Sequence, residues 1–462
     1  MKRLYILFIL VFLLTACGGN GSPAAQVTLP PPAVNTTSVP DPQPVVAEFL
    51  ELWKVEDYPA MYERLTRVSK DAISLEDFTK LFKDTAMSLT LKNFDYTIQS
   101  VATEVSSAKA GYAISYHTNL FTDINTTTEM ILALEDGGWK IVWDDSILFL
   151  EMKGGNRLRL DSQVPARGDI YDRNGEVIAG QTQAYAIGIV PGEVNSNTTL
   201  LRELSDLTGR TQAEIRALYE DAGPDWYIPV GEASADQVNA RLDALKSAGG
   251  IRLSPYTTRL YYEGGIASQT VGYTLFISKE ELEAYKRKGY RGDERIGASG
   301  IEKWGDPYLT GKIGGDLYLV APDGSIITRI ASAPAIPSEN IFTTLDKDLQ
   351  LGAEKSIAGF NGAIVVMEMS TGRILAMASS PDFDPNILDP NNVNVSYMTN
   401  SPLADPDNPQ LNRAAQSSYP PGSVFKVIPM AAALESGLYT KETTYDCKHE
   451  FTELPGDPLY DW

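Results

Sequence analysis

The residues in this sequence best suited to chemistry are Ser423 and Lys426, which lie three positions apart. On a helix, both side chains fall on one face, so the lysine nitrogen can reach the serine oxygen. A serine hydroxyl is a weak nucleophile at neutral pH and needs an adjacent base. A desolvated lysine, whose pKa is lowered by burial, can act as that base. The pair therefore predicts a serine nucleophile, Ser423, with Lys426 as its general base.

The residues around Ser423 favour a helix that begins at this serine. The segment Tyr419–Gly422 contains two prolines and a glycine, which interrupt preceding structure and let the backbone approach a ligand closely. A helix N-terminus at Ser423 also favours negative charge that develops there during a reaction. We expect the apolar run Val427–Leu434 to bury this helix and Gly437 to end it.

Other residues that could do chemistry lack a supporting context. Ser106 and Lys109 have the same spacing, but they lie in a segment of strand character, where the same-face argument fails. His117 also lies in an expected strand, and we interpret it as a packed histidine. Cys447 and His449 are metal-ligand types, but two candidates without further spacing are weak evidence for a site. No metal and no organic cofactor is predicted.

The length and composition indicate an acidic protein of several domains. The chain has 462 residues, which is too long for one hydrophobic core and predicts roughly two to four domains. Its formal net charge is −21, from 39 Lys and Arg against 60 Asp and Glu. Such a surface repels phosphate backbones, so we expect no nucleic acid partner. The two cysteines do not form a disulfide framework.

Residues 1–17 have the pattern of a bacterial lipoprotein signal peptide. A basic start precedes the apolar run Leu4–Leu14, which is shorter than the roughly 20 residues that span a bilayer and suits a signal-peptide core. The run ends at Leu14-Thr15-Ala16-Cys17, which resembles a lipobox, a motif whose cysteine carries a diacylglyceryl group. The alternative is an ordinary signal peptide with a chance cysteine. We expect Cys17 to be lipidated and to anchor the protein on the extracytoplasmic face of a bacterial membrane.

Four stretches follow this segment. Residues 18–43 are rich in Gly, Pro, Ser, Thr and Asn, and we interpret them as a flexible linker. Residues 44–150 show helices followed by strands, which predicts an α+β domain. Residues 155–330 mix strands and helices, and residues 340–462 combine a helix, a hairpin and the Ser423 helix. The fold class expected is therefore multidomain α+β.

The elements expected within these stretches follow from periodicity, caps and turn residues. Helices are predicted from Pro44, from Ser74 with Asp77 placed for a capping box, and over Leu200–Leu207, Thr211–Tyr219 and Asp346–Ala358. Strands are predicted at Phe94–Val105, Ala110–Leu120, Thr127–Leu134, Trp139–Trp143, Ile170-Tyr171, Phe342–Leu345, Gly362–Met369 and Arg373–Ala378. Turns are predicted at Gly137-Gly138, Asp172–Gly175 and Ser370–Gly372, and a long loop at Ser380–Pro409.

Several segments, taken in order, resemble class B penicillin-binding proteins of the low-affinity type. Tyr419–Lys426 resembles the first active-site motif of penicillin-binding proteins and serine β-lactamases. Arg167–Gly175 and Gly297–Glu302 resemble the first and third boxes of the pedestal, or dimerisation, domain. Residues 44–150 are similar to a cone-shaped domain related to nuclear transport factor 2. Residues 340–462 are similar to the N-terminal part of a serine transpeptidase domain with a β-lactamase-like α/β fold.

The resemblance implies roles for four residues. Arg167 and Glu302 match the arginine and glutamate of a polar junction in the pedestal, and the alternative is a surface ion pair of little energetic value. Ser423 would attack the D-Ala-D-Ala end of a peptidoglycan stem peptide, with Lys426 as the general base. β-Lactams would acylate the same serine, and cell-wall synthesis proteins are further expected partners.

Two later motifs of the family, Ser-x-Asn and Lys-Thr-Gly (or Lys-Ser-Gly), do not occur after Lys426. The strand that carries Lys-Thr-Gly normally walls the substrate cleft and supplies an N–H to the oxyanion hole. Loss of one such donor typically costs about 10²–10³ in rate. We therefore expect a C-terminally truncated form of a longer protein.

Two alternatives to an enzyme of this kind are considered. The first is a non-catalytic cell-wall scaffold lipoprotein, in which the incomplete transpeptidase domain is inert. The second is a β-lactam sensor or a β-lactamase. The pedestal boxes argue against the second alternative, because such proteins usually lack a pedestal.

Overall fold

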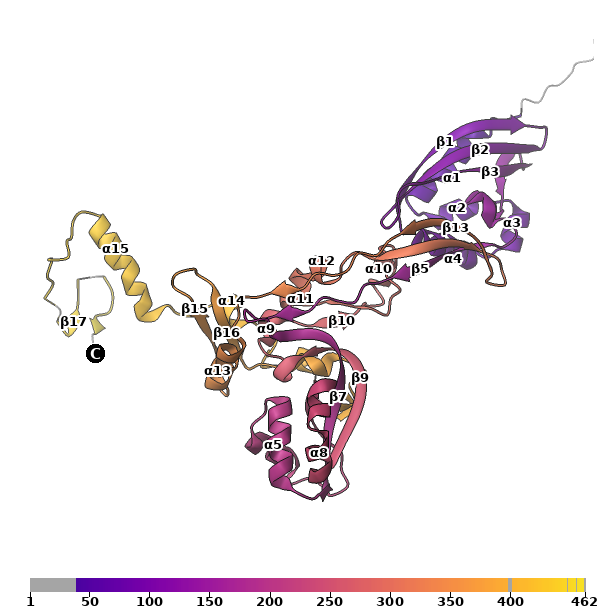
Figure 1. The fold of residues 1–462 in the computed structure, drawn as a ribbon. Coiled ribbons are helices and arrows are strands. Elements are labelled where there is room, and N and C mark those ends of the chain that lie inside the picture. Colours follow the sequence, from indigo (N-terminus) through magenta and orange to yellow (C-terminus); the bar gives the residue numbers. More distant parts are fainter. Residues whose placement is uncertain (1–38, 398–400, 447, 454, 461–462) are drawn as a thin grey trace, which may run out of the picture.

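The computed structural model describes residues 39–397, 401–446, 448–453 and 455–460. Three regions follow one another along an elongated molecule: an N-terminal region (44–150), a middle region (155–330) and a C-terminal region (340–460) (Figure 1). Each of the three regions contains both helices and sheets, which confirms the expected multidomain α+β fold class. Cys17, Cys447 and the apolar run Leu4–Leu14 lie outside the described residues. Within the described part, no helix has the length and apolar character needed to cross a membrane.

Two helices of the N-terminal region, α1 (Gln43–Lys54) and α4 (Leu75–Ser88), form where the apolar spacing predicts them. Two short helices, α2 (Tyr58–Glu63) and α3 (Arg67–Ala72), were not predicted. One face of α1 is buried, including Phe49 and Trp53. The Ser74 hydroxyl caps α4 by accepting a hydrogen bond from the Asp77 backbone N–H at 3.0 Å, as the sequence predicts.

The four strands predicted after α4 form one antiparallel sheet in the order β1-β2-β3-β4. They are β1 (Leu91–Thr103), β2 (Ser107–Thr118), β3 (Ile124–Glu135) and β4 (Gly138–Val142). The turn before β4 is one residue earlier than predicted. Asp136 and Gly137 occupy it, both with positive φ, and Gly138 already pairs with Glu135. A two-residue hairpin loop of this kind needs positive φ at both positions, which Asp and Gly tolerate.

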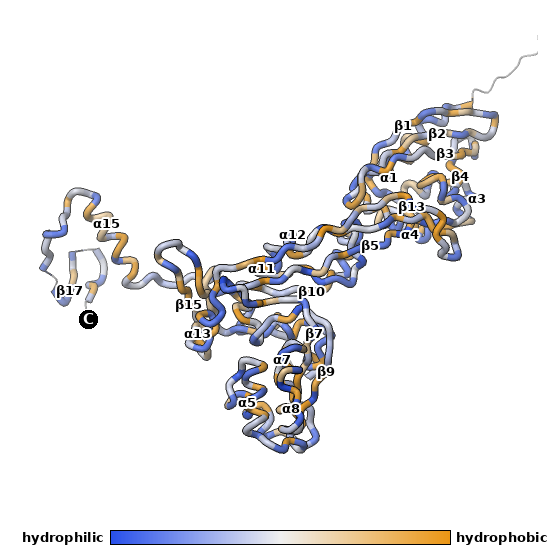
Figure 2. The backbone as a smooth tube through the Cα atoms, in the orientation of Figure 1, coloured by the Kyte–Doolittle hydropathy of each residue, from blue (hydrophilic) through white to orange (hydrophobic). Residues whose placement is uncertain are grey.

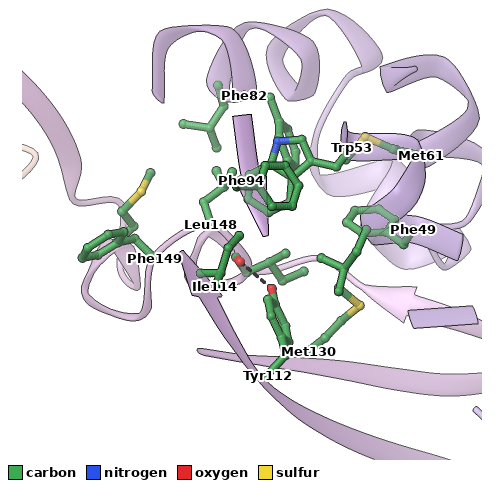
Figure 3. Packing of buried hydrophobic residues seen from close by; sticks show 14 of the residues in the cluster. Phe49, Trp53, Met61, Phe82, Phe94, Tyr112, Ile114, Met130, Leu148 and Phe149 are labelled. Atoms are coloured by element: carbon green, nitrogen blue, oxygen red, sulfur yellow. Dashed lines mark hydrogen bonds between the residues drawn. The ribbon is translucent and has the colours of Figure 1, made fainter. Parts of the chain in front are cut away.

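Aromatic residues fill the core between the helices and the sheet (Figure 3). The ring of Trp53 lies 4.5 Å from that of Phe94 and 5.2 Å from that of Phe82, measured between centroids. Tyr112 is buried, and its hydroxyl donates a hydrogen bond to the Ile147 carbonyl oxygen at 2.6 Å. The same core includes Leu158, Leu317 and Leu319 of the middle region. Apolar packing is therefore continuous between the two regions.

Among the described residues, the middle region contains two larger sheets, a two-stranded sheet of β10 (Thr274–Phe276) and β11 (Arg295–Gly297), and a helical lobe. One larger sheet has the order β13-β12-β5, from Ile326–Ala333, Gly314–Val320 and Arg157–Gln163. The other has the order β14-β6-β7-β8, from Ile341–Phe342, Ile170–Tyr171, Val177–Val194 and Ile228–Ser234, with β9 (Gly249–Tyr261) also paired to β7. The predicted strand at Ile170 and the turn after it are confirmed, and so are the two predicted helices, α5 (Asn197–Thr208) and α6 (Gln212–Tyr219).

The C-terminal region begins with the helix and hairpin expected for its sequence, whereas the strand predicted at Phe342–Leu345 is limited to β14 (Ile341–Phe342). Helix α13 (Lys347–Ile357) is capped by the Asp346 side chain, and it packs on the hairpin of β15 (Gly362–Met367) and β16 (Ile374–Ser380). Short 3₁₀ turns follow in the loop after β16, and then come α14 (Arg413–Gln416), η7 (Gly422–Lys426) and α15 (Val427–Glu435). The middle and C-terminal regions share a core that joins Ile170 and Tyr261 to Leu345 and Phe383.

Candidate active site

Ser423 lies near the start of η7, a 3₁₀ turn that runs directly into α15. Gly422 precedes it with φ +55°, a left-handed value that glycine adopts without strain. A 3₁₀ helix has three residues per turn, so residues at i and i+3 are eclipsed on the same side. The structure thus brings Ser423 and Lys426 to one face of the turn, as a nucleophile and its base require.

No hydrogen bond joins the side chains of Ser423 and Lys426 in the described part of the chain. Among the described residues, neither side chain has a hydrogen-bond or ion-pair partner. Catalysis would require a rotamer change that brings the lysine nitrogen within hydrogen-bond reach of the serine oxygen. Ser423 and Lys426 therefore lie on one face of η7 but are not joined by a hydrogen bond.

The expectation that an apolar run buries the serine helix is wrong for the described structure. No residue of η7 or α15 is buried, and Val424 and Ile428 are 75% and 60% exposed. Figure 2 shows hydrophobic residues along α15, which stands apart from the other elements in Figure 1. The cause is that α15 has no packed sheet or helix against its apolar side among the described residues.

A polar junction in the middle region involves both residues that the sequence singled out. The Arg167 guanidinium bonds to Glu302 twice, through Nε to Oε2 and through Nη2 to the backbone oxygen, both at 2.8 Å. Arg167 Nη1 also bonds to Asp306 Oδ1 at 2.7 Å. The other carboxylate oxygen of Glu302 accepts from Arg259 Nε. Glu302 is thus held between two arginines.

The junction is buried, which excludes the alternative of a surface ion pair. Glu302 is 0% exposed, and Arg259 is 4% exposed. Burial by itself would lower the pKa of Arg167, but Glu302 and Asp306 raise it above its ordinary value. Removing one partner of a buried pair typically costs about 3–5 kcal/mol, because the remaining charge is uncompensated. Arg259 was not predicted from the sequence. The sequence feature that could have indicated it is a charged residue inside the strand-forming segment that ends at Tyr261.

Three family models match the chain in the order of its three regions. The "NTF2-like N-terminal transpeptidase domain" matches residues 41–156, the "Penicillin-binding Protein dimerisation domain" residues 162–343, and the "Penicillin binding protein transpeptidase domain" residues 362–462. The chain belongs to the penicillin-binding proteins. The family and the order of domains expected from the sequence are thereby confirmed.

Curated relatives carry names of the same family. The chain is 27% identical to "Penicillin-binding protein 3" of Bacillus subtilis (strain 168), over 87% of this chain and 61% of the relative. It is 32% identical to "Peptidoglycan D,D-transpeptidase MrdA" of Escherichia coli (strain K12), over 63% of this chain and 47% of the relative. The chain thus spans about half to three fifths of the length of these relatives.

A solved structure, "Complex between Penicillin-Binding Protein (PBP2) and MreC from Helicobacter pylori", matches with 25% identity and a TM-score of 0.44. The match covers 66% of this chain and 58% of that chain.

Asparagine side chains of the loop after β16 bond the transpeptidase part of this penicillin-binding protein to its middle region. The Asn386 side chain accepts from the Tyr261 backbone N–H at 2.9 Å and donates to the Tyr261 carbonyl oxygen at 2.7 Å. Asn392 and Asn394 both donate to Glu232 Oε1, at 2.6 and 2.9 Å. The loop predicted at Ser380–Pro409 is therefore a docked segment.

The other residues considered from the sequence do not form a second site. His117 is not packed in the core as predicted: its ring lies between Asp123 at 3.0 Å and Asp95 at 3.2 Å, and one third of it is exposed. These two carboxylates raise the pKa of the imidazole. Within the described ranges, no group of three or more His, Cys, Asp or Glu side chains is placed to hold a metal.

Proposed function

We propose that this protein is a serine D,D-transpeptidase that cross-links peptidoglycan stem peptides. The observation that carries the proposal is the position of Ser423 and Lys426 on one face at the start of a helix, inside the segment that matches the transpeptidase domain. Relatives named "Peptidoglycan D,D-transpeptidase MrdA" support the same reaction class. The substrate inferred from this reaction class is a stem peptide that ends in D-Ala-D-Ala.

The chemistry follows from the two residue types. Ser423 Oγ attacks the carbonyl carbon of the penultimate D-Ala, and Lys426 accepts the hydroxyl proton as the general base. The peptide C–N bond breaks, the terminal D-Ala leaves with that proton, and an acyl-enzyme ester remains on Ser423. The amine of a neighbouring stem peptide then attacks the ester, gives up a proton and releases the serine. A β-lactam acylates the same oxygen by opening its ring.

The proposed reaction needs an oxyanion hole and a wall for the substrate cleft. Ser-x-Asn and Lys-Thr-Gly, the motifs that serve these purposes in the family, do not follow Lys426 in the printed sequence. The exposed apolar side of α15 also requires covering structure. Reading the gene past the codon for Trp462 tests whether it encodes these parts.

Covalent labelling by a fluorescent penicillin tests the proposal. The full gene product is incubated with the probe, denatured and resolved on a gel. We expect a labelled band that is lost in Ser423→Ala and kept in Ser436→Ala, a control serine at the C-cap of α15. Equal labelling of Ser423→Ala and wild type would contradict the assignment of the nucleophile.

The exposure of the serine helix favours a second candidate, a non-catalytic cell-wall scaffold. In that case the N-terminal and middle regions bind cell-wall proteins and the transpeptidase part is inert. A folded gene product that no penicillin labels at any concentration would support the scaffold over the enzyme.

The proposed location is the extracytoplasmic face of a bacterial membrane, with a lipid on Cys17. The support is the sequence pattern of residues 1–17, in which an apolar run ends at this cysteine. Metabolic labelling with a radioactive fatty acid should mark the wild-type protein and not Cys17→Ala. Equal incorporation into both proteins would contradict the anchor.

A further inference from the structure

Gln269 of the middle region directs its side chain at the transpeptidase part of the chain. It lies in α9 (Ser268–Val271), which Figure 1 shows next to β16 and α14. Its amide nitrogen donates to three backbone carbonyl oxygens, those of Ser379 at 3.3 Å, Pro381 at 3.2 Å and Pro409 at 2.8 Å. A side-chain amide has only two N–H groups, so one of them is shared. Gln269 is 9% exposed, so these bonds are shielded from water.

The three carbonyl groups mark the two ends of the long loop that follows β16. Ser379 and Pro381 lie where β16 ends at Ser380 and the loop begins, and Pro409 lies where the chain returns. One side chain of the middle region therefore closes the base of a transpeptidase loop. Buried carbonyl groups need donors, and here the donor comes from another domain.

The same contact continues into the segment that leads to the serine. The Ser379 hydroxyl donates to the Leu411 carbonyl oxygen and accepts from the Arg413 N–H, both at 3.0 Å. The Asn412 side chain caps α14 by accepting from the Ala415 N–H at 3.2 Å. It also donates to Thr270 Oγ1 of α9 at 3.4 Å.

Helix α14 starts at Arg413, and Ser423 follows ten residues later (423 − 413). Two adjacent side chains of α9, Gln269 and Thr270, thus hold the chain where it enters the serine segment. Among the described residues, the serine turn itself has no such packing support, so its position depends on the segment before it.

We propose that Gln269 is a positioning residue for acylation of Ser423, acting from the dimerisation domain through the base of this loop. The inference rests on the proposed transpeptidase function and adds a determinant outside the transpeptidase domain. A displacement of about 1 Å in a reacting group can cost on the order of 10²-fold in rate. Loss of the Gln269 bonds is therefore expected to slow acylation without changing the affinity for the β-lactam.

The kinetic test uses the full gene product and a fluorescent penicillin, with the dissociation constant of the initial complex and the acylation rate constant measured separately. In Gln269→Ala we expect the acylation rate constant to fall about ten- to a hundredfold while the dissociation constant stays within about twofold. Thr270→Val, which keeps the side-chain shape and loses the bond to Asn412, should lower the rate constant less. Gln183→Ala is the matched control, because Gln183 is exposed and its side chain bonds to Thr257 within the middle region.

Several outcomes would overturn the inference. One is wild-type acylation kinetics in both folded variants, Gln269→Ala and Thr270→Val. Another is a fall in affinity and rate together with a large loss of melting temperature, which would assign Gln269 a purely structural role. Absence of labelling in the wild type would overturn the proposed function, and this inference with it.

Hydrogen–deuterium exchange of the 462-residue chain gives a readout that does not depend on catalysis. Gln269→Ala should speed amide exchange in residues 411–416 and at Ser379, and leave the N-terminal region unchanged. Gln183→Ala should leave residues 411–416 unchanged. Exchange of this segment at the wild-type rate in Gln269→Ala would show that α9 does not hold it, and would overturn the inference even where penicillin labels the wild type.

Discussion

Glu354 is one of the residues whose protonation we expect to contribute to the pH dependence of this fold. Its carboxylate lies on α13 and accepts from the Ala267 N–H and from the Gln350 side chain, both at 2.8 Å. Burial raises its pKa to about 7, although these hydrogen bonds lower it. Asp382 raises the pKa further and Lys355 lowers it. The joint between α13 and the middle region therefore contains a carboxyl group that titrates near neutrality.

The sign of the pH effect follows from the raised pKa. A carboxyl group with a folded-state pKa near 7 and an ordinary value of 4.5 contributes stability that is complete below pH 4.5 and is lost as the pH rises through 7. At pH 8 the ionised form costs on the order of 3 kcal/mol. Glu354→Gln keeps both accepted hydrogen bonds and removes the charge. At pH 8 the variant should therefore be more stable than the wild type by about this amount, and at pH 5 the two proteins should be nearly equally stable.

Urea unfolding at pH 5 and pH 8 measures this difference. Asp348→Asn, an exposed change on the same helix, serves as the control and should leave the pH dependence as in the wild type. A Glu354→Gln variant that loses stability between pH 5 and pH 8 as steeply as the wild type would contradict the assignment.

At the scale of elements, local patterns predicted most helices and strands of the N-terminal region. Helix α4 begins where Ser74 caps it, and the strands show the alternation expected of a sheet with one buried face. The strands begin up to three residues earlier than predicted, as at Leu91 instead of Phe94. Boundaries are less certain because the terminal residues of an element contribute little to its periodicity.

Features that depend on distant parts of the chain could not be predicted in the same way. The Glu302 junction was found only through the family resemblance, and Arg259 was missed because a partner 43 residues away leaves no local pattern. The burial of α15 was predicted from its composition and was wrong, since burial needs a partner surface as well as an apolar face. The interdomain bonds of Gln269 had no signal in the sequence either.

At the scale of the whole molecule, two kinds of contact, apolar and polar, join the N-terminal region to the middle region. The first is apolar, and consists of Leu158, Leu317 and Leu319 packed into the N-terminal core. The second is ionic: Arg287 bonds to Glu56 at 2.7 and 3.0 Å, and Lys83 bonds to Glu283 at 2.9 Å. Burial of one leucine stabilises by roughly 1.5–3 kcal/mol, whereas a partly exposed ion pair contributes about 0.2–1 kcal/mol. The apolar contact is therefore expected to set the arrangement of the two regions.

This ranking predicts different outcomes for two alanine variants. Leu317→Ala should lower the free energy of unfolding by about 2–5 kcal/mol, because it leaves a cavity in the shared core. Arg287→Ala should cost about 1 kcal/mol, an effect that weakens in high salt, and should leave the small-angle X-ray scattering profile unchanged. An increase in the radius of gyration of Arg287→Ala alone would reverse the ranking, because it would mean that the ion pairs, and not the leucines, fix the angle between the two regions.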